Sequence, residues 1–160
     1  MEINIRKAVA EDLDKMINLA MQCIESSIPP TREVSLESVK AARIFDLKTS
    51  LPKLIDMSHM GLFVAEDENG VFLGHVMGYL GDSESVTGER QGWVFDLSVD
   101  KKFRRMGVAT RLMEHFNKFA GQSGFKFVGL LVTTANESAV RFYEKLGFVE
   151  ERKRMGKRLF

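Results

Sequence analysis

The sequence predicts an α/β fold with a mixed sheet, and three observations support this class. Several short segments alternate apolar and polar residues with period two, which is typical of strands. Longer segments between them repeat apolar residues at helical spacing. Asn69 and Gly70 predict an antiparallel hairpin, whereas the strand-helix-strand order further along predicts parallel neighbours joined by a right-handed crossover.

Length and composition indicate one domain. The chain has 160 residues, and 44% of them are hydrophobic, which is enough for a core. We therefore treat residues 1–160 as a single domain. A net charge of +1 gives no overall field that attracts nucleic acid. No apolar run approaches the roughly 20 residues that cross a membrane, and the N-terminus lacks the apolar segment of a signal peptide.

The single cysteine, Cys23, cannot form an internal disulfide, which fits a reducing compartment. Its place beside an apolar helical stripe favours a packed thiol over a nucleophile. We therefore expect a cytoplasmic protein with neither a nucleic-acid nor a membrane partner.

The first part of the chain reads as a strand followed by helices. Pro29 and Pro30 end the first helix, and Ser35 begins the second. Ser50 and Pro52 predict a cap and the first turn of a separate short helix. The predicted elements are a strand over 3–8 and helices over 11–25, 35–48 and 50–59.

A hairpin follows. Asn69 and Gly70 favour a primed two-residue turn between strands over 62–66 and 71–80. Gly74 and Gly78 inside the second strand indicate a bulge or a close backbone approach. The polar, glycine-rich stretch over 81–92 is expected to be a mobile loop.

The last part alternates strands and helices. In the strand that begins at Trp93, we expect Trp93, Phe95, Leu97 and Val99 to share one side. A helix follows Gly107, and the apolar stretch 125–134 predicts a central strand buried on both faces. Asn136 caps a last helix that ends at Gly147. Residues 149–160 suggest one or two closing strands.

The turn between Val99 and Thr110 carries the strongest functional signal. From Lys101 to Arg111 the sequence holds basic residues and no acidic one, and Gly107 opens the helix. The first N–H groups of a helix have no internal partner, and the helix dipole adds positive charge there. Because glycine has no Cβ, an anion can approach the backbone at Gly107. The turn therefore predicts a phosphate site, with a solvated turn that binds nothing as the alternative.

Two separated motifs resemble one family. Arg104-Arg105-Met106-Gly107-Val108-Ala109 is similar to the R/Q-x-x-G-x-G/A signature of the GNAT superfamily of acetyl-CoA-dependent N-acetyltransferases. The segment from Asn136 to Phe148 resembles that family's N-x-x-A-x-x-F/Y-Y-x-x-x-G-F segment. The resemblance implies a mostly antiparallel, twisted sheet flanked by helices, with acetyl-CoA in the splay between two parallel central strands.

The resemblance also implies which residues hold the acetyl donor. Backbone around Leu97 to Val99 pairs with the pantetheine arm, and amides from Arg105 to Thr110 hold the pyrophosphate. Arg104, with Lys101 or Lys102, supplies side-chain charge, and Asn136 contacts the cofactor arm. The implied binding residues are Leu97, Ser98, Val99, Arg104, Arg105, Met106, Gly107, Val108, Ala109, Thr110, Asn136, Ala139, Phe142 and Tyr143.

Two side chains are candidates for catalysis. Tyr143 matches the position that protonates the departing thiolate in the family, although core packing is the alternative. Asp96 is the one acid in the strand before the turn and a candidate general base, with a water relay or another acid as alternatives. His59, His75 and His115 are isolated and lack ligand spacing, so we expect no metal site.

The expected activity is transfer of the acetyl group of acetyl-CoA to a primary amine by direct attack, without a covalent enzyme intermediate. The acceptor is a small molecule or a peptide, and a protein N-terminus or lysine is a narrower alternative. A CoA-binding regulatory module without turnover is a rival, as is a nucleic-acid-binding protein that uses the basic C-terminal residues. The sequence leaves the oligomeric state open, with a homodimer as one expectation.

Overall fold

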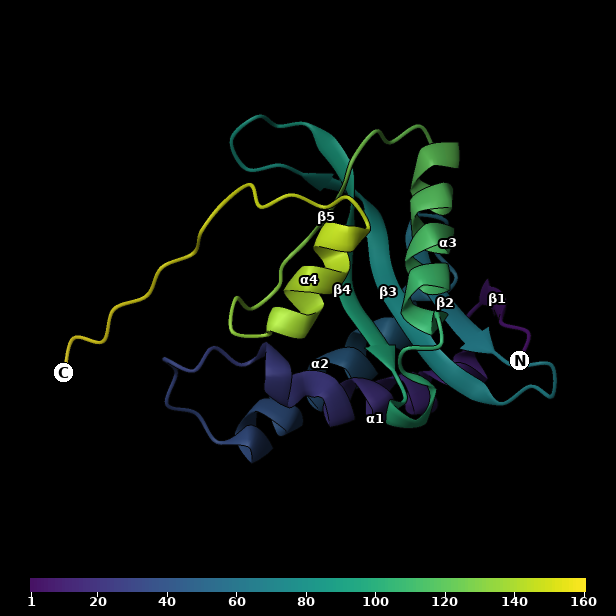
Figure 1. Ribbon diagram of the computed structural model, residues 1–160, viewed down its shortest axis with the longest axis horizontal. Helices are drawn as coiled ribbons and strands as arrows, with labels where there is room; N and C mark the ends of the chain where they lie inside the picture. Colours follow the sequence, from purple (N-terminus) through teal and green to yellow (C-terminus); the bar gives the residue numbers. More distant parts are fainter.

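The computed structural model describes all 160 residues and has a five-stranded sheet in the order β1-β2-β3-β4-β5 (Figure 1). Neighbouring strands are antiparallel except for the parallel pair β4 and β5, so the predicted mixed α/β class is confirmed. The strands are β1 (Asn4–Lys7), β2 (Met60–Glu66), β3 (Phe72–Ser83), β4 (Arg90–Val99) and β5 (Val128–Leu130). The helices are α1 (Leu13–Cys23), α2 (Leu36–Leu54), α3 (Val108–Gln122) and α4 (Glu137–Lys145).

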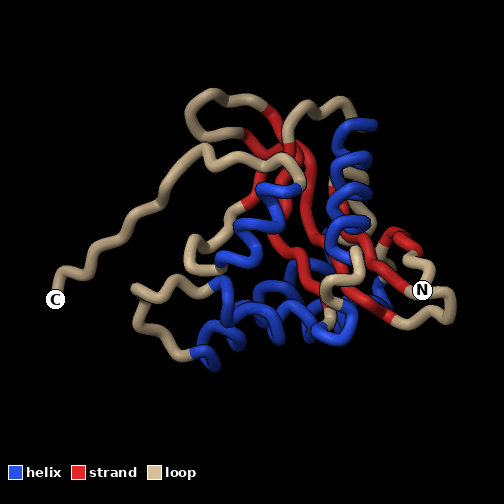
Figure 2. The backbone as a smooth tube through the Cα atoms, in the orientation of Figure 1, coloured by secondary structure: helices blue, strands red, loops and turns tan.

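Helices cover both faces of the sheet (Figure 1, Figure 2). On one face, α1 and α2 bury a core cluster that includes Met16, Leu51 and Met77. On the other face, α3 buries a second cluster around Leu112 and Phe116. Because each helix presents one apolar stripe to the sheet, the sheet is enclosed between two hydrophobic layers.

Glycines in the sheet make room for Phe116 of α3. A Cβ built on Gly61 or Gly78 would lie 2.6 or 2.5 Å from the Phe116 ring, and one on Gly92 would lie 3.3 Å from it. The ring is fully buried against these backbones. The predicted close approach at Gly78 is confirmed, and it explains glycine in a strand whose other residues favour β structure.

Helix α2 corrects the prediction of two separate helices. It runs unbroken from Leu36 to Leu54, and Ser35, where the second helix was expected to begin, is its N-cap and accepts a hydrogen bond from the Ser38 N–H. Pro52 lies in the last turn, so its missing N–H removes only one backbone bond. The Ser50 hydroxyl donates back to the Asp46 carbonyl at 2.7 Å instead of capping a new helix.

None of the helices combines the length and apolar composition that spanning a bilayer requires.

The turn between β2 and β3 is a hairpin but not the primed two-residue turn. Gly70 has φ +77, whereas Asn69 does not have the positive φ that the primed type I turn requires. The Gly70 N–H donates to the Asp67 carbonyl, and the Asp67 N–H donates to the Val71 carbonyl. The hairpin thus has a longer connection with a left-handed glycine.

Half of the expected loop over 81–92 is strand. β3 continues to Ser83 and β4 begins at Arg90, which leaves a short turn. The Glu84 carboxylate accepts bonds from the backbone N–H and hydroxyl of Thr87, and these bonds lower the pKa of Glu84 to about 2. The Glu84 side chain thus bonds to its own turn and closes the connection between β3 and β4.

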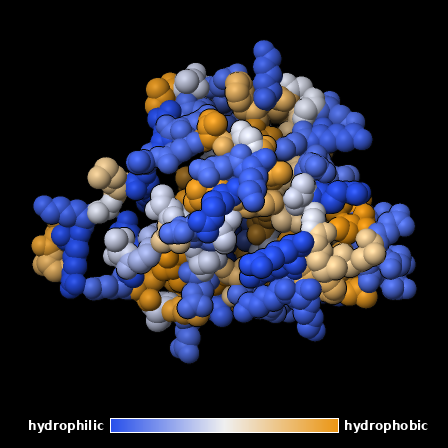
Figure 3. All heavy atoms as spheres, in the orientation of Figure 1, coloured by the Kyte–Doolittle hydropathy of each residue, from blue (hydrophilic) through white to orange (hydrophobic).

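The C-terminal part departs furthest from the predictions. β5 has only 3 residues, is half-buried and lies at the edge of the sheet. The prediction of a central strand over 125–134 was therefore wrong. Residues 149–160 form no strand and project from the body as an exposed tail (Figure 2). No strand follows β5 in the sheet, so its outer edge is unpaired. In Figure 3 the tail ends in apolar atoms, where Phe160 is 100% exposed.

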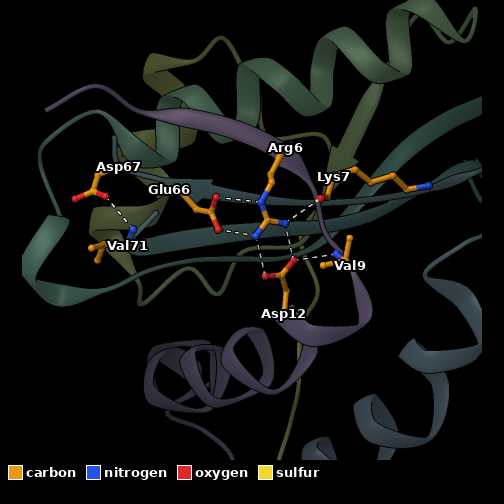
Figure 4. Close-up of polar contacts among 7 residues, drawn as sticks. All are labelled: Arg6, Lys7, Val9, Asp12, Glu66, Asp67 and Val71. Carbon is orange, nitrogen blue, oxygen red and sulfur yellow. Dashed lines mark hydrogen bonds and ion pairs between the residues drawn. The ribbon is translucent and has the colours of Figure 1, made fainter. Parts of the chain in front are cut away.

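An arginine ties the N-terminal strand to α1 and β2 (Figure 4). The Arg6 guanidinium donates to both carboxylate oxygens of Asp12, at 2.7 and 3.0 Å, and to both of Glu66, at 2.5 and 3.0 Å. A further bond reaches the Lys7 carbonyl. The Asp12 side chain is only 5% exposed and also accepts the Val9 N–H. Every guanidinium N–H of Arg6 has a partner within the chain, so the role of this side chain is to stabilise the fold.

Candidate active site

The parallel strands β4 and β5 pair over a short length and then separate. Pairing runs from Gly92 opposite Val128 to Val94 opposite Leu130, and no pair follows. The β5-facing backbone of β4 beyond Val94 therefore has no strand beside it. Leu97, Ser98 and Val99, which the family resemblance implies lie along the cofactor arm, are in this unpaired part and pair on their other side with β3. Because β5 is an edge strand, the splay does not lie between two central strands.

A β-bulge lies where the splay begins. Met77 of β3 is opposite Asp96 and Gly78 is opposite Val94, so Phe95 is an extra residue in β4. The prediction that Trp93, Phe95, Leu97 and Val99 share one side of β4 is therefore wrong. Phe95 packs against the core under α1 and α2, whereas Leu97 and Val99 pack against the α3 core.

The bulge also determines where Asp96 points. Its carboxylate oxygen Oδ2 lies 2.6 Å from Nε2 of His75, and the Ser98 hydroxyl donates to the same oxygen at 3.0 Å. The Asp96 side chain is 22% exposed. A carboxylate thus reaches solvent beside the unpaired edge of β4.

The turn after β4 has the backbone of an anion site. Arg105 has φ +62 and Gly107, the N-cap of α3, has φ +84. No backbone N–H from residue 104 to residue 110 donates a hydrogen bond within the chain. A Cβ on Gly107 would meet nothing within 4 Å. Consecutive free N–H groups in alternating backbone conformations, at a helix N-terminus, are suited to phosphate oxygens.

The basic side chains of this turn are not equivalent. The Arg104 Nε donates to the Val99 carbonyl at 3.2 Å, and its Nη2 lies 3.4 Å from the Cys23 sulfur. Arg104 therefore bridges the end of β4 to the end of α1. Lys101, Lys102 and Arg105 are exposed and make no ion pair within the chain.

Helix α4 begins beside a pocket of about 470 Å³. Its predicted cap is confirmed, because the Asn136 Oδ1 accepts the Ala139 N–H at 3.3 Å. The Asn136 amide nitrogen makes no hydrogen bond within the chain and remains a free donor at the pocket. The opposite wall comes from the segment after α1, to which Thr133 donates a bond at the Ser27 carbonyl. The pocket is lined by Glu25, Ser26, Ile28, Pro30, Ala135, Asn136, Glu137 and Ser138.

Tyr143 lies on the face of α4 that packs against the α3 core. Its ring makes edge contacts with Phe142 and Phe148, at centroid distances of 5.1 and 5.7 Å. Burial, and secondarily the nearby charge of Asp96, raise the pKa of Tyr143 to about 12. Val99, Val108, Ala109 and Phe142 belong to or pack against the same cluster. The α3 core therefore brings together only part of the predicted set, namely Leu97, Val99, Val108, Ala109, Phe142 and Tyr143.

Comparison with known proteins decides the family. The model of the Acetyltransferase (GNAT) family matches residues 24–148, which includes both motifs. The chain belongs to the GNAT acetyltransferase family. The resemblance carried by the two motifs and the predicted enzyme class are thereby confirmed, and the family to which the chain belongs uses acetyl-CoA.

Relatives of this GNAT domain cover most of its length. It is 26% identical to the N-alpha-acetyltransferase daf-31 of Caenorhabditis elegans over 89% of this chain and 68% of that protein. A putative acetyl transferase from Pyrococcus furiosus superimposes with a TM-score of 0.80 at 25% identity, covering 99% and 100% of the two chains. An aminoglycoside N-acetyltransferase in complex with CoA shares the fold, with a TM-score of 0.73 at 18% identity and coverage of 98% and 94%.

Sequence reasoning missed one residue that contacts the candidate site, His75. It lies in the middle of β3, fully buried, with its ring nitrogen on Asp96. His75 and Asp96 are distant in sequence, and the bulge at Phe95 brings them to the same face of the sheet. Counting on from Trp93 opposite Tyr79 without the bulge would place Asp96 opposite Val76, on the other face. The polar residue inside an otherwise apolar strand was the available signal.

Proposed function

We propose that this chain transfers the acetyl group of acetyl-CoA to a primary amine by direct attack. The run of unbonded backbone N–H groups over 104–110 carries the proposal, because it adjoins the unpaired edge of β4. The pyrophosphate binds these N–H groups, and the pantetheine arm pairs with Leu97 to Val99 as an added strand would. Asn136 donates to the arm from the start of α4.

The chemistry follows from the groups at the splay. The amine nitrogen attacks the thioester carbon, and the tetrahedral oxyanion receives hydrogen bonds from β4 backbone N–H groups. As the C–N bond forms, the nitrogen becomes positive and its proton passes to Asp96, and from there to water. The C–S bond then breaks, and the sulfur takes a proton from the Tyr143 hydroxyl, which solvent later restores. No group of the chain is acylated, and Cys23 packs against Arg104.

The acceptor class is a separate question. The name of the Caenorhabditis elegans relative, an N-alpha-acetyltransferase, favours a protein N-terminus as the narrower alternative to a small amine. The pocket between Ser26 and Glu137 has two carboxylates, Glu25 and Glu137, on its walls. Their negative charge is suited to a substrate that carries further positive charge.

The test is a thiol-release assay with acetyl-CoA against polyamines, amino acids, aminoglycosides and short peptides with free N-termini. Release that depends on an amine supports the proposal, and the panel distinguishes small amines from peptides. Tight CoA binding without release for any acceptor favours the regulatory module. Salt-dependent binding of RNA or DNA favours a nucleic-acid-binding protein instead of an enzyme.

Location and assembly are part of the same proposal. We expect the enzyme to act in the cytoplasm, where acetyl-CoA is available and Cys23 remains reduced. A homodimer is the expected assembly, and the open edge of β5 together with the exposed tail supports it. Sedimentation of the purified chain tests the dimer directly.

A further inference from the structure

His75 is the one fully buried polar ring that touches the site. It shows 0% exposure on β3, opposite Ser98 of β4, and its ring stacks on Phe72 at a centroid distance of 6.2 Å. A side chain with two polar nitrogens is costly in this position unless they are bonded. The contacts of the two nitrogens therefore bear on what His75 does.

The two nitrogens have different surroundings. Nε2 lies 2.6 Å from Oδ2 of Asp96, whereas Nδ1 is buried and has no hydrogen-bond partner. A charged ring would place an unpartnered N–H at Nδ1 in an apolar site, and an unsatisfied buried donor is expensive. The arrangement therefore fits a neutral ring that carries its proton on Nε2 and donates it to Asp96.

Both bonds to Asp96 end on one oxygen. The Nε2 of His75 and the hydroxyl of Ser98 donate to Oδ2, at 2.6 and 3.0 Å. No group of the chain donates to Oδ1. Because the side chain is 22% exposed, Oδ1 is the oxygen that remains open to a ligand. The buried pair fixes the plane of the carboxylate.

We propose that His75 is a positioning residue for acetyl transfer, which holds Oδ2 of Asp96 so that Oδ1 accepts the proton of the attacking amine. This inference rests on the proposed function. His75 itself takes no proton, because Nδ1 has neither a partner nor access to solvent. Without the ring, Asp96 rotates about its side-chain bonds and the amine loses its oriented acceptor.

The kinetic test uses substitutions of similar volume. His75→Leu removes the donor, and we expect kcat to fall by about 10- to 100-fold with an unchanged KM for acetyl-CoA, since misplacing a catalytic group costs on that order. His75→Gln retains an N–H donor and is expected to recover part of the loss. His115→Leu is the matched control, because His115 packs on Phe63 of the other core layer, and its kcat should match wild type.

A double-mutant cycle separates positioning from general structure. In an Asp96→Asn background, His75→Leu is expected to change kcat by less than about twofold, because the group it positions is gone. An equal fall in both backgrounds would overturn the inference, as would full activity of His75→Leu. Wild-type protein that shows no amine-dependent thiol release contradicts the proposed function instead.

A spectroscopic test needs no turnover. Nitrogen-15 NMR of imidazole-labelled protein at pH 7 is expected to show His75 as the neutral tautomer with its proton on Nε2. In Asp96→Ala the Nε2–H resonance should move, because its acceptor is lost. A proton on Nδ1, or a resonance that does not respond to Asp96→Ala, would contradict the inference even if the enzyme is active.

Discussion

At the scale of single residues, the buried environment of Tyr143 keeps its hydroxyl available as a proton donor. Burial and the Asp96 charge raise the pKa of Tyr143 to about 12, so the hydroxyl remains protonated over the whole usual pH range. A typical thiol has a pKa of roughly 8.5, so transfer from Tyr143 to a free thiolate is unfavourable. Tyr143 therefore helps most while negative charge is still developing on the sulfur.

We predict that Tyr143→Phe lowers kcat by about 10²-fold, near the lower end of general-acid effects, because the acid is weak. CoA affinity and thermal stability should change little, since the ring keeps its contacts with Phe142 and Phe148. Steady-state kinetics under conditions where chemistry limits the rate provides the measurement. An unchanged kcat in Tyr143→Phe, together with a loss of stability in Tyr143→Ala, would instead identify Tyr143 as a packing residue.

At the scale of elements, the turn between β4 and α3 combines left-handed backbone with free N–H groups. Gly107 needs φ +84, which costs other residues roughly 1–2 kcal/mol. A Cβ there faces open space within the chain, so a larger residue obstructs a ligand more than it disturbs packing. Backbone and ligand effects therefore need separate controls.

Gly107→Ala is predicted to weaken CoA binding by about tenfold or more, because the Cβ lies where a phosphate approaches the N–H groups. Gly124 is the matched control: it has φ +87 beyond the far end of α3, and a Cβ there also meets nothing within 4 Å. Gly124→Ala should cost similar stability and leave CoA affinity intact. Calorimetry that finds equal CoA affinity in the two variants refutes the phosphate turn.

The exposed cations of the same turn predict a salt effect. Lys101, Lys102 and Arg105 lie in water, where charge is screened over about 10 Å at 0.1 M salt. CoA affinity should fall as salt rises, and Lys101→Gln with Lys102→Gln should flatten that dependence. Arg104→Gln should act differently, through the link between β4 and α1. Affinity measured from 0.02 to 0.5 M salt checks this, and a flat wild-type profile rejects it.

At the scale of the whole molecule, local signals were predictable and non-local pairing was not. The cap at Asn136 and the close approach at Gly78 followed from residue chemistry. The turn proposed to bind phosphate could be located because a strand, glycine and helix start are adjacent in sequence. The motif spacing identified the family, which the match over residues 24–148 supports.

What the sequence could not predict depends on partners that lie far along the chain. The bulge at Phe95 depends on how β4 pairs with β3, and it decides that Asp96 meets His75. The short β5 has no strand on its outer edge, although its apolar sequence resembles a central strand. Helix α2 passes through Pro52 because Leu47 and Leu51 are buried against the core, which outweighs a local stop signal.

The Arg6 network predicts how the whole fold responds to acid. Hydrogen bonds from Arg6 lower the pKa of Asp12, against the opposing effect of burial. Arg6→Gln leaves a carboxylate of 5% exposure with fewer donors, which should reduce the unfolding free energy at pH 7 by about 1–3 kcal/mol. Urea unfolding of the two proteins at pH 7 measures the difference.

The pH dependence of that stability has a definite sign. The folded pKa of Asp12 lies below the value of about 3.9 that Asp has in unfolded chains, so ionised Asp12 stabilises the fold at every pH above about 4. The contribution disappears as pH falls through the folded pKa, because the protonated carboxyl no longer pairs with Arg6. Wild type should therefore lose more unfolding free energy between pH 7 and pH 3 than Asp12→Asn does. Equal losses in the two proteins would show that the Arg6 network does not link the fold to pH.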